Sequence, residues 1–128
     1  MHKIRDWLYV ASYRETQDLA QLNNQKVGAV LHLQQLVEHD GIATLYLPIQ
    51  EGLPLSKHDI VAGLNFIQDQ HTQGKSVVVA CGAGISRSVI FFFFFLKIAE
   101  NIILSIAFSD IREVLEFAMP DELHWQSI

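Results

Sequence analysis

The chain has 128 residues, of which 50% are apolar and 18% are charged, and its formal net charge is −5. This length and composition predict one compact domain over residues 1–128 and argue against a disordered chain. The acidic balance, with no basic stripe, argues against a nucleic-acid partner. A single cysteine excludes an intramolecular disulfide framework, and the N-terminal residues lack the apolar core of a signal peptide, so we expect a cytoplasmic protein.

Strands and helices are predicted to alternate along the first half of the chain. Residues 7–10 (WLYV) have the composition of a short strand. Residues 16–25 place their leucines on one face of an amphipathic helix. Residues 27–33 and 44–49 are rich in strand-forming side chains and are separated by a polar stretch, which predicts two further strands.

A second helix and a very apolar strand are predicted in the middle of the chain. Ser56 is a candidate N-cap residue, with Asp59 three positions later in a capping-box arrangement. Gly74 is a candidate for the residue that ends this helix. Residues 76–80 (SVVVA) form a continuous apolar run, which is typical of a strand buried on both faces of a mainly parallel sheet.

Five consecutive phenylalanines occupy residues 91–95. The apolar run around them is shorter than the roughly 20 residues that span a membrane, and Lys97 interrupts it, so we expect a buried helix and no membrane association. Further helices are expected at residues 106–117 and after Pro120. This alternation predicts an α/β fold with a central, mainly parallel sheet flanked by helices on both faces.

The segment CGAGISRS, residues 81–88, follows the apolar strand and contains the single cysteine. A helix that begins near Ser86 or Arg87 would place this loop at the carboxyl end of the strand, where α/β sheets bind ligands. Gly82 and Gly84 allow successive backbone N–H groups to converge, and convergent N–H groups at a helix N-terminus bind anions. Because a guanidinium can bind two phosphate oxygens at once, the loop predicts a phosphate site.

The same surroundings would favour the thiolate form of Cys81, because a helix N-terminus and a nearby guanidinium stabilise negative charge. A thiolate beneath a bound phosphate is a nucleophile suited to covalent phosphoryl transfer through a cysteinyl-phosphate. The alternative interpretation is a buried, inert cysteine in a turn between strand and helix, which is common for a lone cysteine.

CGAGISRS resembles the signature of the cysteine-dependent protein phosphatases, in which a cysteine, five residues, an arginine and a serine follow one another. Within this protein tyrosine phosphatase superfamily, the AG and SRS residues are most similar to the small dual-specificity branch. Residues 4–12 resemble the opening strand of the family, residues 46–52 the segment leading into its general-acid loop, and residues 112–120 its closing helices. The resemblance spans most of the chain and implies a protein tyrosine phosphatase-like fold.

This resemblance implies a role for each residue of the signature. Cys81 is the nucleophile, Arg87 binds phosphate and stabilises the transition state, and Ser88 donates a hydrogen bond to the departing sulfur. The phosphate pocket is lined by the backbone amides of Gly82, Ala83, Gly84, Ile85, Ser86 and Arg87. The mechanism needs no metal and no cofactor. The histidines are scattered, and each is interpreted as a surface or core residue rather than as a metal ligand: His2, His32, His39, His58, His71 and His124.

The sequence departs from the family pattern at two positions. Ala80 stands in place of the histidine that usually precedes the nucleophile, organises the loop and stabilises the thiolate. Glu51 stands where the family has an aspartate as general acid, and we predict that role for it, with a solvated loop carboxylate as the alternative. Asp59 is the nearest downstream aspartate, and helix capping explains it better.

The predicted substrate is a phosphorylated protein or peptide. The variable pocket positions carry no lysine, which favours a monophosphate on a side chain over an inositol lipid with several phosphates. We expect hydrolysis of phosphotyrosine, with phosphoserine and phosphothreonine also admitted to a shallow pocket, and inhibition by vanadate or phosphate.

Two other functions are weighed against hydrolysis. A pseudophosphatase would bind phosphorylated partners with little turnover; Ala80 and Glu51 favour it, whereas the intact Cys81, Arg87 and Ser88 oppose it. Thiol-based reduction, as of arsenate, ranks last because it normally needs further cysteines to resolve the oxidised intermediate.

Overall fold

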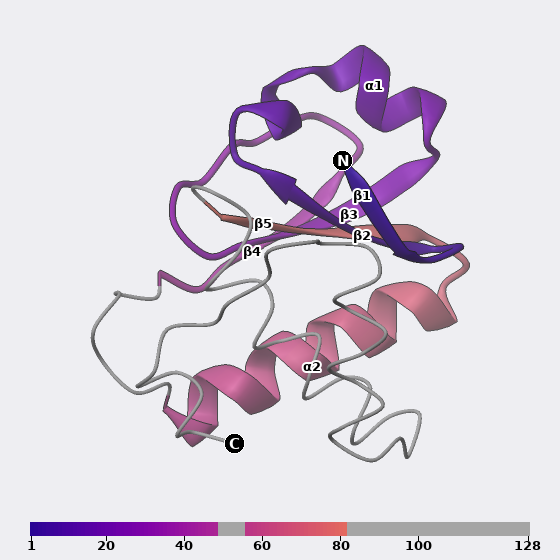
Figure 1. Cartoon of the computed structure of the whole chain (residues 1–128). Coiled ribbons are helices and arrows are strands. Elements are labelled where there is room, and N and C mark those ends of the chain that lie inside the picture. The colour runs from indigo at the N-terminus through magenta and orange to yellow at the C-terminus, as the bar shows by residue number, and fades with distance from the viewer. Residues whose placement is uncertain (49–55, 82–128) are drawn as a thin grey trace.

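The computed structural model describes residues 1–48 and 56–81, and a five-stranded sheet runs through this part of the chain (Figure 1). Its strands are β1 (His2–Arg5), β2 (Leu8–Ser12), β3 (Val27–His32), β4 (Ala43–Tyr46) and β5 (Ser76–Cys81). Their order across the sheet is β1-β2-β5-β3-β4. The β1–β2 pair is antiparallel and the other pairs are parallel. The predicted central, mainly parallel sheet is therefore confirmed.

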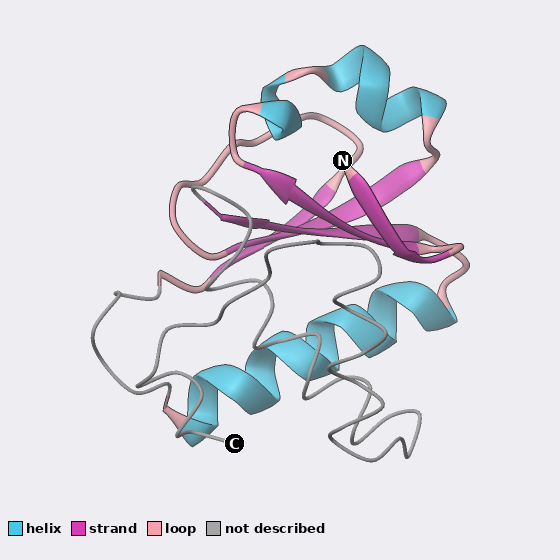
Figure 2. Cartoon of the chain, viewed as in Figure 1, coloured by secondary structure: helices cyan, strands magenta, loops and turns pink. Residues whose placement is uncertain are grey.

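Helices lie on both faces of this sheet. The short helix α1 (Leu19–Asn24) covers one face, and the long helix α2 (Lys57–Thr72) runs along the opposite face (Figure 1). Figure 2 shows the same three layers, with the strands between the two helices. The predicted flanking of the sheet on both faces is confirmed in the part of the chain that the structure describes.

The ends of α2 follow the residues that predict them. Ser56 caps the first turn, because its Oγ accepts a hydrogen bond from the Asp59 N–H at 3.1 Å. Gly74 follows the C-cap with a φ of 80°, in the left-handed region that favours glycine, and its N–H donates to the His71 carbonyl at 2.9 Å. Capping at both ends fixes where the helix begins and ends.

Two elements differ from the sequence predictions. The helix predicted at residues 16–25 is divided into a 3-10 turn, η1 (Glu15–Gln17), and α1. Asp18 separates them because it is the N-cap of α1: its backbone leaves the helical region, and its carboxylate accepts from the Gln21 N–H at 3.1 Å. The sheet also gains β1, which pairs with β2 and changes register between Lys3 and Arg5.

The core is built on β5, the middle strand of the sheet. Val77, Val78 and Val79 are fully buried, which confirms that this strand is covered on both faces. On the side of α1, the cluster consists of Tyr9, Ala11, Leu22, Val27, Val30, Val78 and Ala80. Because successive strand residues point to opposite faces, Val77, Val79 and Cys81 belong to the other side, which α2 covers.

Among the described residues, no helix is long and apolar enough to cross a membrane. The phenylalanine run at 91–95 and the helices predicted at 106–117 and after Pro120 lie outside the described residues.

Candidate active site

Cys81 is the last residue of β5, at the carboxyl edge of the parallel strands. Its partner in the neighbouring strand β2 is Ser12. Only 2% of the Cys81 surface is exposed. The predicted position of the thiol, at the edge where α/β sheets bind ligands, agrees with the structure.

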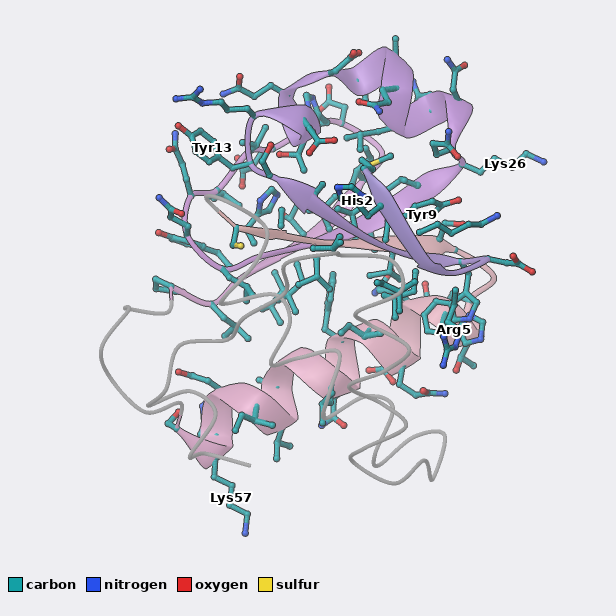
Figure 3. All side chains as sticks on the ribbon, in the orientation of Figure 1. His2, Arg5, Tyr9, Tyr13, Lys26 and Lys57 are labelled. Atoms are coloured by element: carbon teal, nitrogen blue, oxygen red, sulfur yellow. The ribbon has the colours of Figure 1, made fainter. Side chains whose placement is uncertain are left out.

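Hydrogen bonds from both sides hold the backbone around Cys81. The Tyr13 N–H, just beyond the end of β2, donates to the Cys81 carbonyl at 2.9 Å. The Leu33 N–H, just beyond β3, donates to the Ala80 carbonyl at 2.8 Å. Figure 3 places Tyr13 at this edge of the sheet. Pairing therefore continues to the end of β5, and a side chain on such a rigid element is held in a well-defined position.

A small hydrogen-bonded brace supports the turn that carries Tyr13. The Glu15 carboxylate accepts from the Ser12 N–H at 3.2 Å and from the Ser12 hydroxyl at 3.3 Å, and it pairs with the Met1 ammonium group. Burial raises the pKa of Glu15, but the hydrogen bonds from the Met1 ammonium and Ser12 outweigh it, so the pKa lies below its usual value. The carboxylate is thus charged at neutral pH and keeps the turn beside Cys81 closed.

His32 is the last residue of β3 and the register partner of Ala80. Its side chain is 0% exposed, and neither ring nitrogen makes a hydrogen bond. Burial lowers the pKa of His32. The backbones of Val37 and Gln35 lie close enough to favour the protonated ring, without a hydrogen bond of acceptable geometry, while His39 disfavours it. The ring is therefore neutral at neutral pH.

The loop after β3 is fastened to its neighbours on two sides. The Tyr46 hydroxyl, at the end of β4, donates to the Gln34 carbonyl at 3.0 Å. The His39 Nε2 lies 2.7 Å from the Thr16 carbonyl. These contacts join the ends of β3 and β4 and the turn η1 along one edge, the edge that contains Cys81.

The structure places only part of the predicted site. Cys81 and Ala80 are described, and Asp59 lies in the first turn of α2, where the cap accounts for it. The remaining predicted site residues lie outside the described residues: Glu51, Gly82, Ala83, Gly84, Ile85, Ser86, Arg87 and Ser88.

Sequence reasoning missed the position of one residue at this edge. It placed His32 in the core or on the surface without connecting it to Cys81, because a strand register cannot be read from a single sequence. Within residues 1–48 and 56–81, no group of three or more His, Cys, Asp or Glu side chains is arranged to bind a metal.

A family model for the catalytic domain of dual specificity phosphatases matches residues 8–128. The chain belongs to this family. The dual specificity phosphatase model covers the strand that carries Cys81, the CGAGISRS segment and all later residues, so the resemblance drawn from that segment is confirmed.

Two relatives are similar to this chain over nearly its whole length. Human dual specificity protein phosphatase 22 is 29% identical in an alignment 128 positions long, which covers 97% of this chain and 61% of the relative. The mouse protein of the same name gives the same values. The chain thus spans about three fifths of the length of these relatives.

Solved phosphatase structures share the fold. Human DUSP28 superposes with a TM-score of 0.91 at 19% identity, covering 99% of this chain and 92% of the other. DUSP15 gives a TM-score of 0.87 at 20% identity, covering 98% of this chain and 82% of the other. At such low identity the match establishes a protein tyrosine phosphatase-like α/β fold and no more.

Proposed function

We propose that the chain is a phosphoprotein phosphatase that hydrolyses phosphotyrosine, and also phosphoserine and phosphothreonine, through a cysteinyl-phosphate intermediate. Membership of the dual specificity phosphatase family supports the reaction class. The observation that carries the proposal is the place of the single cysteine, which is the last residue of the central buried strand and the first residue of CGAGISRS.

The first chemical step is attack by the Cys81 thiolate on the phosphorus of the substrate. A sulfur–phosphorus bond forms while the bond from phosphorus to the ester oxygen breaks, and Glu51 gives its proton to that departing oxygen. Arg87 and the amides of residues 82–87 bind the phosphoryl oxygens, whose charge they stabilise in the transition state.

The second step regenerates the enzyme. Water attacks the phosphorus of the cysteinyl-phosphate and loses a proton to Glu51, the sulfur–phosphorus bond breaks, and inorganic phosphate leaves. Ser88 donates a hydrogen bond to the sulfur as negative charge returns to it. The Glu51 carboxyl group is therefore protonated at the start and at the end of each cycle, and water is the only reactant consumed besides the phosphorylated substrate.

A reducing compartment such as the cytoplasm suits this chemistry, because the thiolate must remain unoxidised. The absence of lysine from the variable pocket positions favours side chains that carry one phosphate. Aryl phosphates should react fastest, since a phenoxide leaves more readily than an alkoxide and depends less on the acid.

The decisive experiment compares the wild-type chain with Cys81→Ser in the hydrolysis of p-nitrophenyl phosphate and of phosphopeptides, with chelator present. We expect turnover that vanadate inhibits, and a loss of at least about 10⁴-fold in Cys81→Ser, as is usual when a catalytic nucleophile is removed. Ser76→Ala, at the opposite end of the same strand, is the matched control and should retain activity. Turnover that survives Cys81→Ser would contradict the mechanism.

A binding protein with little turnover is the second candidate, because Ala80 and Glu51 replace two groups that assist catalysis in the family. The same experiment separates the two functions. A pseudophosphatase would bind phosphopeptides tightly, release no phosphate, and bind them equally well as Cys81→Ser.

A further inference from the structure

The strand β4 forms one margin of the sheet, and its only neighbour among the described strands is β3. The two strands pair in parallel, with Val30 opposite Thr44 and His32 opposite Tyr46. Just beyond β4, the Leu47 N–H donates to the His32 carbonyl at 2.9 Å. Because successive residues of a strand direct their N–H and C=O groups to opposite sides, the backbone groups of Thr44 and Tyr46 point away from β3.

These outward backbone groups have no partner in the part of the chain that the structure describes. No described strand pairs with β4 on this side, and no other described backbone group bonds to Thr44 or Tyr46 there. The strand has no charged residue and no proline, its pairing with β3 keeps one register, and each of its residues is at least partly exposed. An edge strand of this kind is a template to which another extended chain can add.

β4 ends at the same edge of the sheet as Cys81. Tyr46 is its last residue, and β3 alone separates it from β5. Neighbouring strands are about 4.8 Å apart, so a chain added outside β4 would lie about 14 Å from β5. An extended chain covers that distance in about four residues. A peptide paired with β4 can therefore present a phosphorylated residue, about four positions further along, to Cys81.

The surroundings of β4 are acidic and partly apolar. The loop that leads to the strand carries Glu38 and Asp40, both exposed, and residues 33–48 contain no lysine or arginine. Leu36 and Tyr46 are 38% and 42% exposed. Apolar and aromatic side chains pair well with β-branched side chains on a neighbouring strand. The complementary ligand is thus an extended segment of β-branched residues with a basic residue at the end near Asp40.

We propose that β4 is a docking strand for the substrate, which adds an extended, basic segment of the phosphorylated protein to this margin of the sheet. The inference deepens the proposed phosphatase function and rests on it. A second copy of this chain fits less well, because stable dimers bury more than about 1,000 Å² and only Thr44 and Tyr46 offer outward backbone groups. Two copies would also bring Glu38 and Asp40 together, whereas a substrate needs only transient binding.

The first test measures docking without turnover. The probe is an unphosphorylated synthetic peptide, a lysine followed by alternating valines and threonines, added to the wild-type chain. Amide hydrogen exchange at Thr44 and Tyr46 should slow by about tenfold when about nine-tenths of the chain is bound, because their N–H groups gain acceptors. The Leu45 amide already faces β3, so its exchange should not change.

N-methylated peptides supply a matched control that leaves the side chains and the charge unchanged. The two alternate sets of peptide amides are methylated in turn, and only one of these sets can face β4. Methylation of the facing set should weaken binding by at least about tenfold, because two hydrogen bonds are lost. Methylation of the other set should leave binding unchanged.

The second test connects docking to turnover. The segment is joined through a flexible spacer of about four residues to phosphotyrosine, at the end away from the lysine and in both chain directions. In one direction the KM should be at least about fivefold lower than for the spacer and phosphotyrosine alone.

Substitutions in β4 and before it should act on this peptide alone. Thr44→Pro removes one outward N–H and should raise the KM of the segment peptide by about fivefold, with no change for p-nitrophenyl phosphate. Thr44→Val keeps the backbone donor and should behave as wild type. Asp40→Asn should raise the KM about twofold, and only while the peptide carries its lysine.

The outcomes distinguish this inference from the proposed function. If exchange at Thr44 and Tyr46 is unaffected, or both methylated sets bind alike, docking on β4 is wrong and the phosphatase function stands. If one set alone loses binding but the wild-type chain shows no turnover, docking stands and the proposed function falls. A dimer that Thr44→Pro abolishes would assign the margin to a second copy and overturn the inference. If Thr44→Pro does not fold, the methylated peptides decide with the wild-type chain.

Discussion

The two ends of the parallel strands differ in how completely their polar groups are satisfied. At the amino end, near Arg5 in Figure 3, the Val77 N–H donates to the Trp7 carbonyl at 2.7 Å, and the Trp7 and His71 rings stack with centroids 3.5 Å apart. At the carboxyl end, near Tyr13, lie the buried Cys81 thiol and the His32 ring, and the two nitrogens of that ring make no hydrogen bond.

This difference indicates that the amino end of the strands contributes mainly to the stability of the fold, whereas the carboxyl end contributes mainly to the reaction. Residues at the amino end make contacts that fold the chain, and a substitution there should alter the free energy of unfolding more than the reaction. The carboxyl end keeps a buried imidazole without a hydrogen bond, which is unfavourable for folding, as functional sites often do. A substitution there should alter the reaction more than the stability.

Among the variants that leave Cys81 in place, the largest effect is expected for Glu51→Gln, at a residue that follows β4 in the sequence. Loss of the general acid should lower kcat/KM for phosphotyrosine peptides by about 100-fold, near the lower limit for this kind of catalysis. It should also remove the alkaline limb of the pH–rate profile, while the melting temperature stays the same. An unchanged profile would assign Glu51 to the solvated surface instead.

Ile67→Ala tests the stabilising side of the comparison. Ile67 lies in the second half of α2, which leads to the amino end of β5, and it is fully buried. The cavity should lower the free energy of unfolding by about 2–5 kcal/mol, measured by urea denaturation. Turnover per folded molecule should remain close to wild type, and a large loss at a temperature where the variant is folded would show that the two ends are coupled.

Most core substitutions lower the free energy of unfolding, but His32→Leu should not. Because the unsatisfied ring is removed, stability at neutral pH should be equal to wild type or higher by about 1 kcal/mol. A variant that is more stable and slower would place His32 on the functional side of the comparison. Loss of stability at neutral pH would show that the ring is needed for packing.

The same variant should change how stability depends on pH. Burial lowers the pKa of His32 in the folded chain, so below about pH 6.5 this histidine binds a proton more readily in the unfolded chain than in the folded one. The free energy of unfolding therefore decreases as the pH is lowered. His32→Leu should remove this fall. Glu15, whose pKa is also lowered, should contribute its own loss only below about pH 4.3, where a carboxylate with an ordinary pKa is protonated. Chemical denaturation from pH 7 to about pH 2 resolves the two ranges.

A small effect, confined to one helix end, is expected for Ser56→Ala. Removal of the hydroxyl that accepts the Asp59 N–H should cost about 1 kcal/mol, the usual value for an N-cap. Ser56→Asp keeps an acceptor at this position and should recover most of the loss. Since the cap acts on α2 alone, kcat should not change in either variant.

Local chemistry made much of the fold predictable. The apolar run at 76–80 predicted a strand buried on both faces, and Ser56 and Gly74 predicted both ends of α2, because each of these features acts within a few residues. The division between η1 and α1 was also encoded, in Asp18 and Gln21, but the leucine periodicity across residues 16–25 concealed it.

Features that depend on distant pairing were not predictable in the same way. β1 is a short, charged strand that exists because β2 pairs with it. The row formed by Ala11, Ala80 and His32 depends on the register of three strands that are far apart in the sequence. For the candidate site, sequence reasoning identified the position of Cys81, whereas the roles of Glu51 and of residues 82–88 remain predictions.

The edge strand β1 also affects the tendency of the protein to aggregate at high concentration. It forms one margin of the sheet, is only four residues long, carries Lys3 and Arg5, and changes register between them. Short length, positive charge and a bulge are the features by which natural sheets prevent a strand of another molecule from adding to an open margin. At this margin the molecule is therefore protected against aggregation by strand addition.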